Sequence, residues 1–141
     1  MKKVCEGRIT SPFGLRHDPI DNLWREHNGV DIAAPTGTPV FSPVDGTVAA
    51  VYNHAAGGKT LIIRSACGKL RFGFCHLSGH RVRSGQQVGR GRHIADSGNT
   101  GRTTGPHLHF SAKAGGEWDD LGNYAGGGFV DPAPYIVIGD E

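Results

Sequence analysis

The chain has 141 residues, which favours a single domain over residues 1–141 with room for a buried core. Its formal net charge of +2 is too small to argue for nucleic-acid binding, so we expect no nucleic-acid partner. It contains 23 glycines without a fixed period, which excludes collagen and suits a β-rich protein with many tight turns.

The N-terminal stretch "MKKVCEGRITSPFG" has two lysines but lacks the apolar segment of a signal peptide. No apolar run approaches the length of a membrane span. We therefore expect no signal peptide in this chain and no membrane partner. The three cysteines form neither a CxxC pair nor an even set, so we expect Cys5, Cys67 and Cys75 to be reduced thiols in the core.

Strand patterns follow one another along the chain. Residues 38–54 predict two short strands around a turn at residues 43–46, and residues 59–78 predict a hairpin that turns at residues 65–69. Next, "GQQVGRGRHIADSGNTG" predicts a short strand followed by a glycine-rich loop. The segment "PHLHFSAKA" predicts another strand.

A flexible loop is expected over residues 115–128, before the C-terminal segment "FVDPAPYIVI". Helical periodicity is hard to find, because glycine or proline interrupts the windows in which an amphipathic helix would need apolar spacing of three and four. The predicted fold class is all-β: an antiparallel sheet or sandwich with long loops around a groove.

The first chemically informative segment is "HNGVDIAAP". His27 and Asp31 are four residues apart, and the glycine and prolines nearby argue against a helix. On an extended strand His27, Gly29 and Asp31 share one face. The absent side chain of Gly29 would leave room for a ligand or ion to lie close.

The second segment is "PHLHF". On a strand His107 and His109 point to one face while Leu108 and Phe110 point to the other. A third segment, "FGFCHLS", contributes His76.

In that third segment His76 has the same parity as Phe72 and Phe74, and Cys75 has the opposite parity. We therefore expect Cys75 to face away from any metal. Zinc accepts a mixture of imidazole and carboxylate ligands, and a catalytic site uses three of them. Five candidate groups leave two imidazoles for proton transfer and oxyanion stabilisation.

In combination, "HNGVDIAAPTGTPV", "GFCHLS", "GQQVGRG" and "SGNTGRTTGPHLHF" resemble the lysostaphin-like zinc endopeptidases, peptidase family M23. The resemblance covers nearly the whole chain and implies the fold of that family, related to the duplicated hybrid motif. It implies that His27, Asp31 and His109 bind one zinc ion per chain. His76 and His107 would then be the two catalytic histidines that do not bind zinc, with either one as general base.

The resemblance also implies a peptidoglycan peptide as substrate, and we favour the D-alanyl–meso-diaminopimelate cross-link over glycine bridges. The expected activity is that of a zinc metalloendopeptidase acting on the cell wall, as a monomer, either after phage-lysin-like (endolysin) release or as a trimmed periplasmic or secreted enzyme. The alternative is a non-catalytic module of the same fold that binds cell wall or activates an amidase. The glycines between residues 97 and 105 suit either the wall of a substrate groove or a simple turn.

Overall fold

The computed structural model describes residues 2–18, 23–114 and 129–139, with the backbone alone described for residues 15–18 and 23–27. The strands, in chain order, are β1 (Lys2–Lys3), β2 (Arg8–Ser11), β3 (Gly14–Asp18), β4 (Leu23–His27), β5 (Gly29–Ala33), β6 (Pro39–Phe41), β7 (Gly46–His54), β8 (Gly58–Ser65), β9 (Leu70–His80), β10 (Gln87–Val88), β11 (His93–Ser97), β12 (His107–Ala114), β13 (Phe129–Val130) and β14 (Val137–Gly139). The helical content of the described residues is one 3₁₀ turn, η1 (Ala133–Tyr135).

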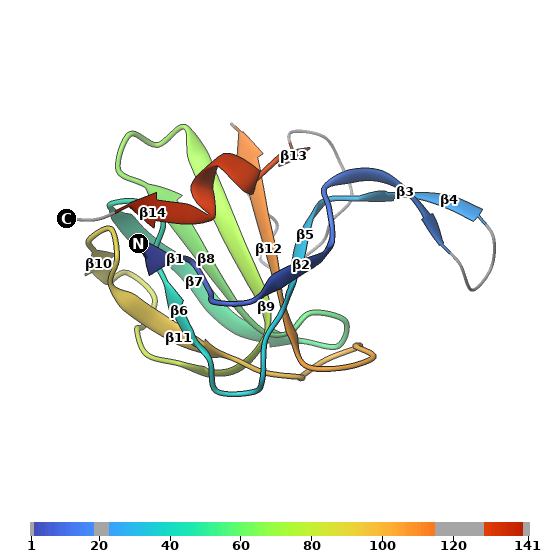
Figure 1. Cartoon of the computed structure of the whole chain (residues 1–141). Helices are drawn as coiled ribbons and strands as arrows, with labels where there is room; N and C mark the ends of the chain where they lie inside the picture. The colour runs from blue at the N-terminus through green and yellow to red at the C-terminus, as the bar shows by residue number, and fades with distance from the viewer. Residues whose placement is uncertain (1, 19–22, 115–128, 140–141) are drawn as a thin grey trace.

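The main sheet is antiparallel, and its strands follow the order β10-β7-β8-β9-β12-β5-β2 (Figure 1). Strand β11 pairs with both β6 and β9, and β13 pairs with β12. Two small sheets accompany the main one: β1 pairs with β14, and the β3–β4 hairpin extends away from the main sheet beyond β2 and β5 (Figure 1). The predicted all-β antiparallel fold class is therefore confirmed.

The predicted hairpin is present, since β8 and β9 pair across the turn that joins them. The two strands predicted on either side of residues 43–46 are also present, but they do not pair with each other: β6 pairs with β11, and β7 pairs with β8 and β10. The segment with a predicted short strand and loop contains two strands, β10 and β11. The loop predicted over residues 115–128 lies outside the described residues.

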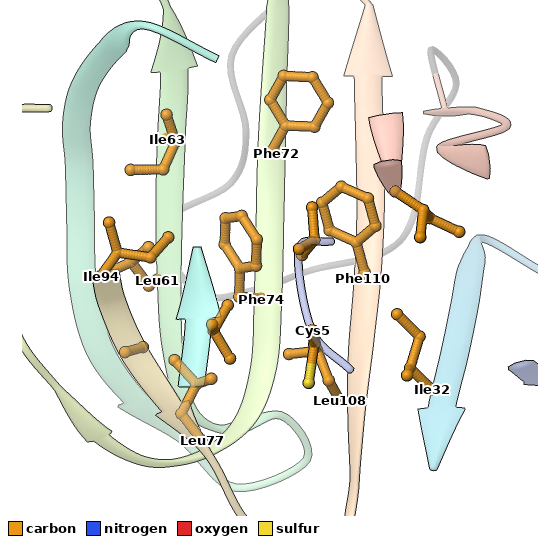
Figure 2. Close-up of a cluster of buried hydrophobic side chains, with 14 of the residues drawn as sticks. Cys5, Ile32, Leu61, Ile63, Phe72, Phe74, Leu77, Ile94, Leu108 and Phe110 are labelled. Atoms are coloured by element: carbon orange, nitrogen blue, oxygen red, sulfur yellow. The ribbon is translucent and has the colours of Figure 1, made fainter. Parts of the chain in front are cut away.

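The core lies on one face of the main sheet, where apolar side chains from β5, β9 and β12 meet (Figure 2). The Phe110 ring stacks on Phe74 at a centroid distance of 5.3 Å and on Phe72 at 5.9 Å. All three rings are fully buried. Apolar burial of this kind is the main stabilising term for a chain of this size.

The cysteines only partly follow the prediction. All three are free thiols, and Cys5 and Cys75 are buried, but Cys67 is exposed. The prediction that Cys67 lies in the core is wrong because it occupies the turn between β8 and β9, where no neighbouring strand covers it. Across the described residues we find no helix with the length and apolar character needed to cross a membrane.

Candidate active site

Strand β12 brings His109 next to Asp31 of β5. The two residues are direct partners in the antiparallel register, and directly opposed residues share a face of the sheet. His109 Nδ1 lies 2.8 Å from Asp31 Oδ1, and His107 Nε2 lies 3.7 Å from the same oxygen. As the alternation predicts, Leu108 and Phe110 are buried on the opposite, core face.

The absence of a side chain at Gly29 serves the pairing of β5 with β12, and it does not leave space for a ligand as expected. A Cβ atom at this position would lie 2.4 Å from the carbonyl oxygen of Phe110 and 3.1 Å from His109 Nε2. The space beside Gly29 is therefore filled by β12, and the expectation that it holds a ligand or ion is wrong. The glycine lets β5 and β12 approach closely enough to bring Asp31 against His109.

His27 and Asp31 do not share one continuous strand. His27 is the last residue of β4, Asn28 forms a bend, and β5 begins at Gly29. The expectation of one continuous strand through both residues is therefore wrong, because the chain bends at Asn28 between the β3–β4 hairpin and the main sheet. The side chain of His27 lies outside the described residues, and its role as a metal ligand stays a prediction.

Asn28, which the sequence analysis did not single out, contacts His109. Its amide Oδ1 accepts a hydrogen bond from His109 Nε2–H at 2.9 Å. In a neutral imidazole the other nitrogen is then unprotonated, so the lone pair of Nδ1 and the Asp31 carboxylate face each other as two acceptors. A cation bound to both atoms would relieve this contact, and one carboxylate with one imidazole suits zinc.

Asp31 and His109 are therefore placed so that both could hold one metal ion, and a catalytic zinc site uses three such ligands. Among the residues whose side chains the structure describes, no group of three His, Cys, Asp or Glu side chains converges in a way that could hold a metal. The third predicted ligand, His27, is outside that set. The donor chemistry therefore fits zinc as far as the described side chains extend.

His76 joins the cluster through an irregularity in β9. Between the pairs Leu61–Phe74 and Lys59–Leu77 the register shifts, because β9 has one extra residue within this interval. His76 adopts φ 64°, the single positive φ of a non-glycine residue among the described residues. Such a β-bulge re-aims a side chain, and both Phe74 and Leu77 remain in the core.

As a result the His76 ring lies 4.7 Å from the His107 ring and 6.5 Å from the His109 ring, measured between centroids. Simple alternation would have turned His76 toward the core with Phe72 and Phe74. Cys75 is the register partner of His109 and therefore lies on the same face. The expectation that Cys75 faces away from that side of the sheet is wrong.

Backbone carbonyls orient the two remaining histidines. His76 Nδ1 lies 2.8 Å from the carbonyl oxygen of Thr100, and His107 Nδ1 lies 2.8 Å from that of Gly105. Because a carbonyl can only accept, both rings donate from Nδ1, and each neutral ring keeps its Nε2 lone pair. Both rings are therefore in the tautomer that accepts a proton at Nε2.

The pKa of His76 is lowered from that of an ordinary imidazole, mainly because burial disfavours the charged ring. The hydrogen bond to the Thr100 carbonyl opposes this effect, and the neighbouring His107 and His109 reinforce it. His76 is therefore held neutral at neutral pH and is able to accept a proton.

The glycine-rich segment after β11 packs backbone against backbone. A Cβ at Gly98 would lie 2.5 Å from the amide nitrogen of Ser78, and one at Gly101 would lie 2.3 Å from that of Gly58. These contacts account for Gly98 and Gly101 by the turn and its packing against β8 and β9. A role for the segment in contacting substrate stays a prediction.

Sequence reasoning missed Asn28, Thr100 and Thr103, each of which contacts a histidine of this cluster. Thr103 Oγ1 lies 3.1 Å from His107 Nδ1 and 2.9 Å from the carbonyl oxygen of Gly105. The sequence offered one signal that could have identified them, because Asn28 lies in the motif that begins at His27 and both threonines lie in the motif that ends with "PHLHF".

One carboxylate and three histidines gathered on a face of an antiparallel sheet are the groups that metal-dependent hydrolases use. Residues 25–120 match the sequence model of Peptidase family M23, and the chain belongs to this family. The family resemblance deduced from the sequence motifs is therefore confirmed.

Two curated relatives show the extent of the similarity. The DD-carboxypeptidase/endopeptidase Mpg of Neisseria meningitidis is 43% identical over 110 residues, which cover 78% of this chain and 25% of Mpg. The peptidoglycan DD-endopeptidase ShyA of Vibrio cholerae is 43% identical over 104 residues, which cover 73% of this chain and 24% of ShyA. The chain thus spans about a quarter of the length of these relatives.

Solved structures share the fold. LytU superimposes with a TM-score of 0.77 and 38% identity, covering 92% of this chain and 84% of the LytU chain. The catalytic domain of lysostaphin, an antimicrobial peptidase from Staphylococcus simulans, gives a TM-score of 0.77 and 27% identity, covering 92% of both chains. A zinc-containing peptidase from Vibrio cholerae gives 0.71 and 41%, covering 79% of this chain and 34% of that one.

Proposed function

We propose that this chain is a single-domain zinc endopeptidase that hydrolyses peptide cross-links or stem peptides of bacterial peptidoglycan. One zinc ion is held by His27, Asp31 and His109, and His76 and His107 are the catalytic histidines. The observation that carries the proposal is the meeting of Asp31 and three histidines from β5, β9 and β12 on one face of the sheet.

The chain's own residues suit this chemistry. When bound, zinc supplies a Lewis acid that polarises the scissile carbonyl and lowers the pKa of a water molecule. His76 and His107 both present an unprotonated Nε2, so either can accept the proton of the attacking water. The ring that becomes protonated can then donate that proton to the leaving amine, and the other ring can donate to the developing oxyanion from Nε2 in its protonated, imidazolium form.

The substrate follows from the relatives. ShyA and ShyB of Vibrio cholerae are peptidoglycan DD-endopeptidases, 43% and 45% identical to this chain over the matched residues. This supports the D-alanyl–meso-diaminopimelate cross-link as the bond cleaved, in preference to glycine bridges. The enzyme would act at the cell wall as a monomer, which size-exclusion chromatography of the zinc-loaded protein can check.

Metal analysis tests the ligand set. We expect one tightly held zinc per chain, lost in His109→Ala and retained in His107→Ala, because the proposal makes His109 a zinc ligand and His107 a catalytic histidine that does not bind zinc. Wild-type protein that holds no zinc after exposure to it would contradict the proposal. So would a His109→Ala variant that still holds zinc at wild-type affinity.

Digestion of purified sacculi tests the activity. We expect the wild type to release soluble fragments whose masses identify a cut D-alanyl–diaminopimelate bond. His76→Ala and His107→Ala should both lose most of this activity, on the order of a hundredfold or more. Wild-type protein that binds sacculi but releases no fragments would instead favour the alternative, a non-catalytic module that binds cell wall.

A further inference from the structure

We propose that Thr100 is a positioning residue for His76: its hydroxyl holds the backbone carbonyl that orients the His76 ring. This inference rests on the proposed function, because it assigns a task to His76 within that reaction. Thr100 lies in the loop that joins β11 to β12, outside the sheet that carries the histidines.

His76 needs external support. Its φ of 64° is a conformation that L-residues adopt only at a cost of about 1–3 kcal/mol, and such conformations persist where the surroundings enforce them. Two hydrogen bonds hold it: the backbone N–H donates to the Gly57 carbonyl at 2.7 Å, and the ring Nδ1–H donates to the Thr100 carbonyl at 2.8 Å.

The Thr100 hydroxyl links its own loop to β9 and to β8 through two hydrogen bonds. Thr100 Oγ1 donates to the Leu77 carbonyl at 2.6 Å and accepts from the Lys59 backbone N–H at 3.0 Å. Leu77 directly follows His76 on β9, and Lys59 is the second residue of β8. One hydroxyl therefore fixes the acceptor of the His76 ring relative to the backbone that carries the ring.

Close backbone packing makes this arrangement rigid. A Cβ at Gly58 would lie 2.4 Å from the carbonyl carbon of Thr100, so no side chain separates the loop from β8. The amide of Arg102 also donates to the Ala56 carbonyl at 2.9 Å. Small changes at Thr100 are therefore transmitted to the loop carbonyl rather than absorbed by flexible side chains.

The consequence concerns the tautomer and direction of the His76 ring. With the Thr100 carbonyl in place, the proton stays on Nδ1 and the Nε2 lone pair is available for proton transfer. If the carbonyl moves, the ring can turn or take the other tautomer, and misplacement of a catalytic group by about 1 Å costs roughly a hundredfold in rate.

Three variants of the full chain, each loaded with zinc, test the proposal. Thr100→Val keeps the shape and removes the hydroxyl, Thr100→Ser keeps the hydroxyl, and Thr38→Val is the matched control. Thr38 Oγ1 also donates to a backbone carbonyl, that of Pro35 at 2.7 Å, but contacts none of the histidines. Zinc content and thermal unfolding are measured for every variant to show that each one is folded and loaded.

With a soluble cross-linked muropeptide as substrate, we expect Thr100→Val to lower kcat by about 10–100-fold while KM changes less than about threefold. Thr100→Ser should retain kcat within about threefold of the wild type, and Thr38→Val should retain all of it. A Thr100→Val variant with wild-type kcat would overturn the proposal. So would a Thr100→Ser variant as slow as Thr100→Val.

A spectroscopic measurement gives a result that does not depend on turnover. Long-range ¹H–¹⁵N spectra at about pH 8.5, where imidazole is neutral, report which ring nitrogen carries the proton. The His76 signal, assigned by its absence in His76→Gln, should show Nδ1–H in the wild type and Thr100→Ser, and a mixture in Thr100→Val. An unchanged tautomer in Thr100→Val overturns the inference, whereas an inactive wild type with these tautomers overturns only the proposed function.

Discussion

Three histidines of one cluster differ in the atoms that hold them. His109 donates from Nε2 to Asn28 and presents Nδ1 to Asp31, whereas His76 and His107 donate from Nδ1 to backbone carbonyls. The partner of one ring nitrogen determines what the other can do. In the proposed site this difference separates a metal ligand from two proton-transfer groups.

Asn28 should therefore affect metal affinity without touching the metal. Loss of such a partner of a ligating histidine commonly costs about 10–100-fold in affinity, so we expect Asn28→Ala to raise the Kd for zinc by this amount. Competition with a chromophoric chelator measures it. Asn53→Ala, at an exposed position on β7, is the control and should leave the Kd unchanged. Equal affinity in Asn28→Ala and the wild type would contradict the role given to Asn28.

At the scale of elements, β12 is the strand on which the cluster depends. It pairs with β5 on one side and β9 on the other, which brings Asp31 and His76 to opposite flanks of the His107–His109 pair. Two local features allow these pairings to bring the side chains together: the close approach of β5 and β12 at Gly29, and the bulge in β9 at His76.

Replacing Gly29 should force β5 and β12 apart. Gly29→Ala would bring its Cβ within 2.4 Å of the Phe110 carbonyl, which is backbone and cannot move aside without disturbing the pairing. We expect a loss of about 1–3 kcal/mol in the free energy of unfolding, measured by urea denaturation. Gly79→Ala is the control, because a Cβ there meets nothing within 4 Å. Equal losses in the two variants would contradict this account of Gly29.

An ion pair connects β11 to the chain beyond β9. Asp96 accepts from His93 Nε2 at 2.7 Å and from Arg81 Nε at 2.9 Å. Burial alone raises the pKa of Asp96, but the hydrogen bonds from His93 and Arg81 outweigh it, so the pKa lies below the ordinary value of 3.8. The carboxylate is thus favoured by folding, and its stabilising contribution is present above pH 3.8 and lost as the pH falls below it.

Asp96→Asn should accordingly be less stable than the wild type by about 1 kcal/mol near pH 7, a modest amount because Arg81 is largely exposed. Below pH 3.8 the difference should shrink as Asp96 becomes protonated in the wild type. Urea denaturation at a series of pH values measures both quantities. A difference that stays constant throughout this acid range would show that the charge of Asp96 does not stabilise the fold.

At the scale of the whole molecule, one sheet separates two environments. The face with the Phe72, Phe74 and Phe110 rings is the core (Figure 2). The opposite face of the sheet carries His107 and His109. Because successive side chains of β12 point to opposite faces of the sheet, this one strand contributes to both the core and the histidine cluster. The strand that positions the histidines is therefore also one of the most deeply buried strands.

Stability should consequently depend strongly on Phe110. Phe110→Ala removes a fully buried ring that stacks on two others, and we expect a loss of about 3–5 kcal/mol in the free energy of unfolding. Denaturation in urea measures it. Val137→Ala, at a side chain that is 45% exposed, should cost less than about 1 kcal/mol. A small loss in Phe110→Ala would contradict the placement of the core.

The sequence by itself determined the all-β class, the β8–β9 hairpin, the β12 strand and the residues of the candidate cluster. These features depend on alternation, turn residues and motif spacing, which are local properties of the chain. The division of β12 into a histidine face and a core face is the clearest case, because period-two alternation alone requires it.

The tertiary structure decided how the segments meet. Only the long-range register pairs His109 with Asp31, and only the extra residue of β9 between Phe74 and Leu77 turns His76 away from the core. The close approach at Gly29 and the carbonyl partners of His76 and His107 likewise come from residues distant in sequence or from the folded loop. Pairing between distant strands has no local signal in the sequence. The sequence therefore identified these histidines but did not predict the directions of their side chains.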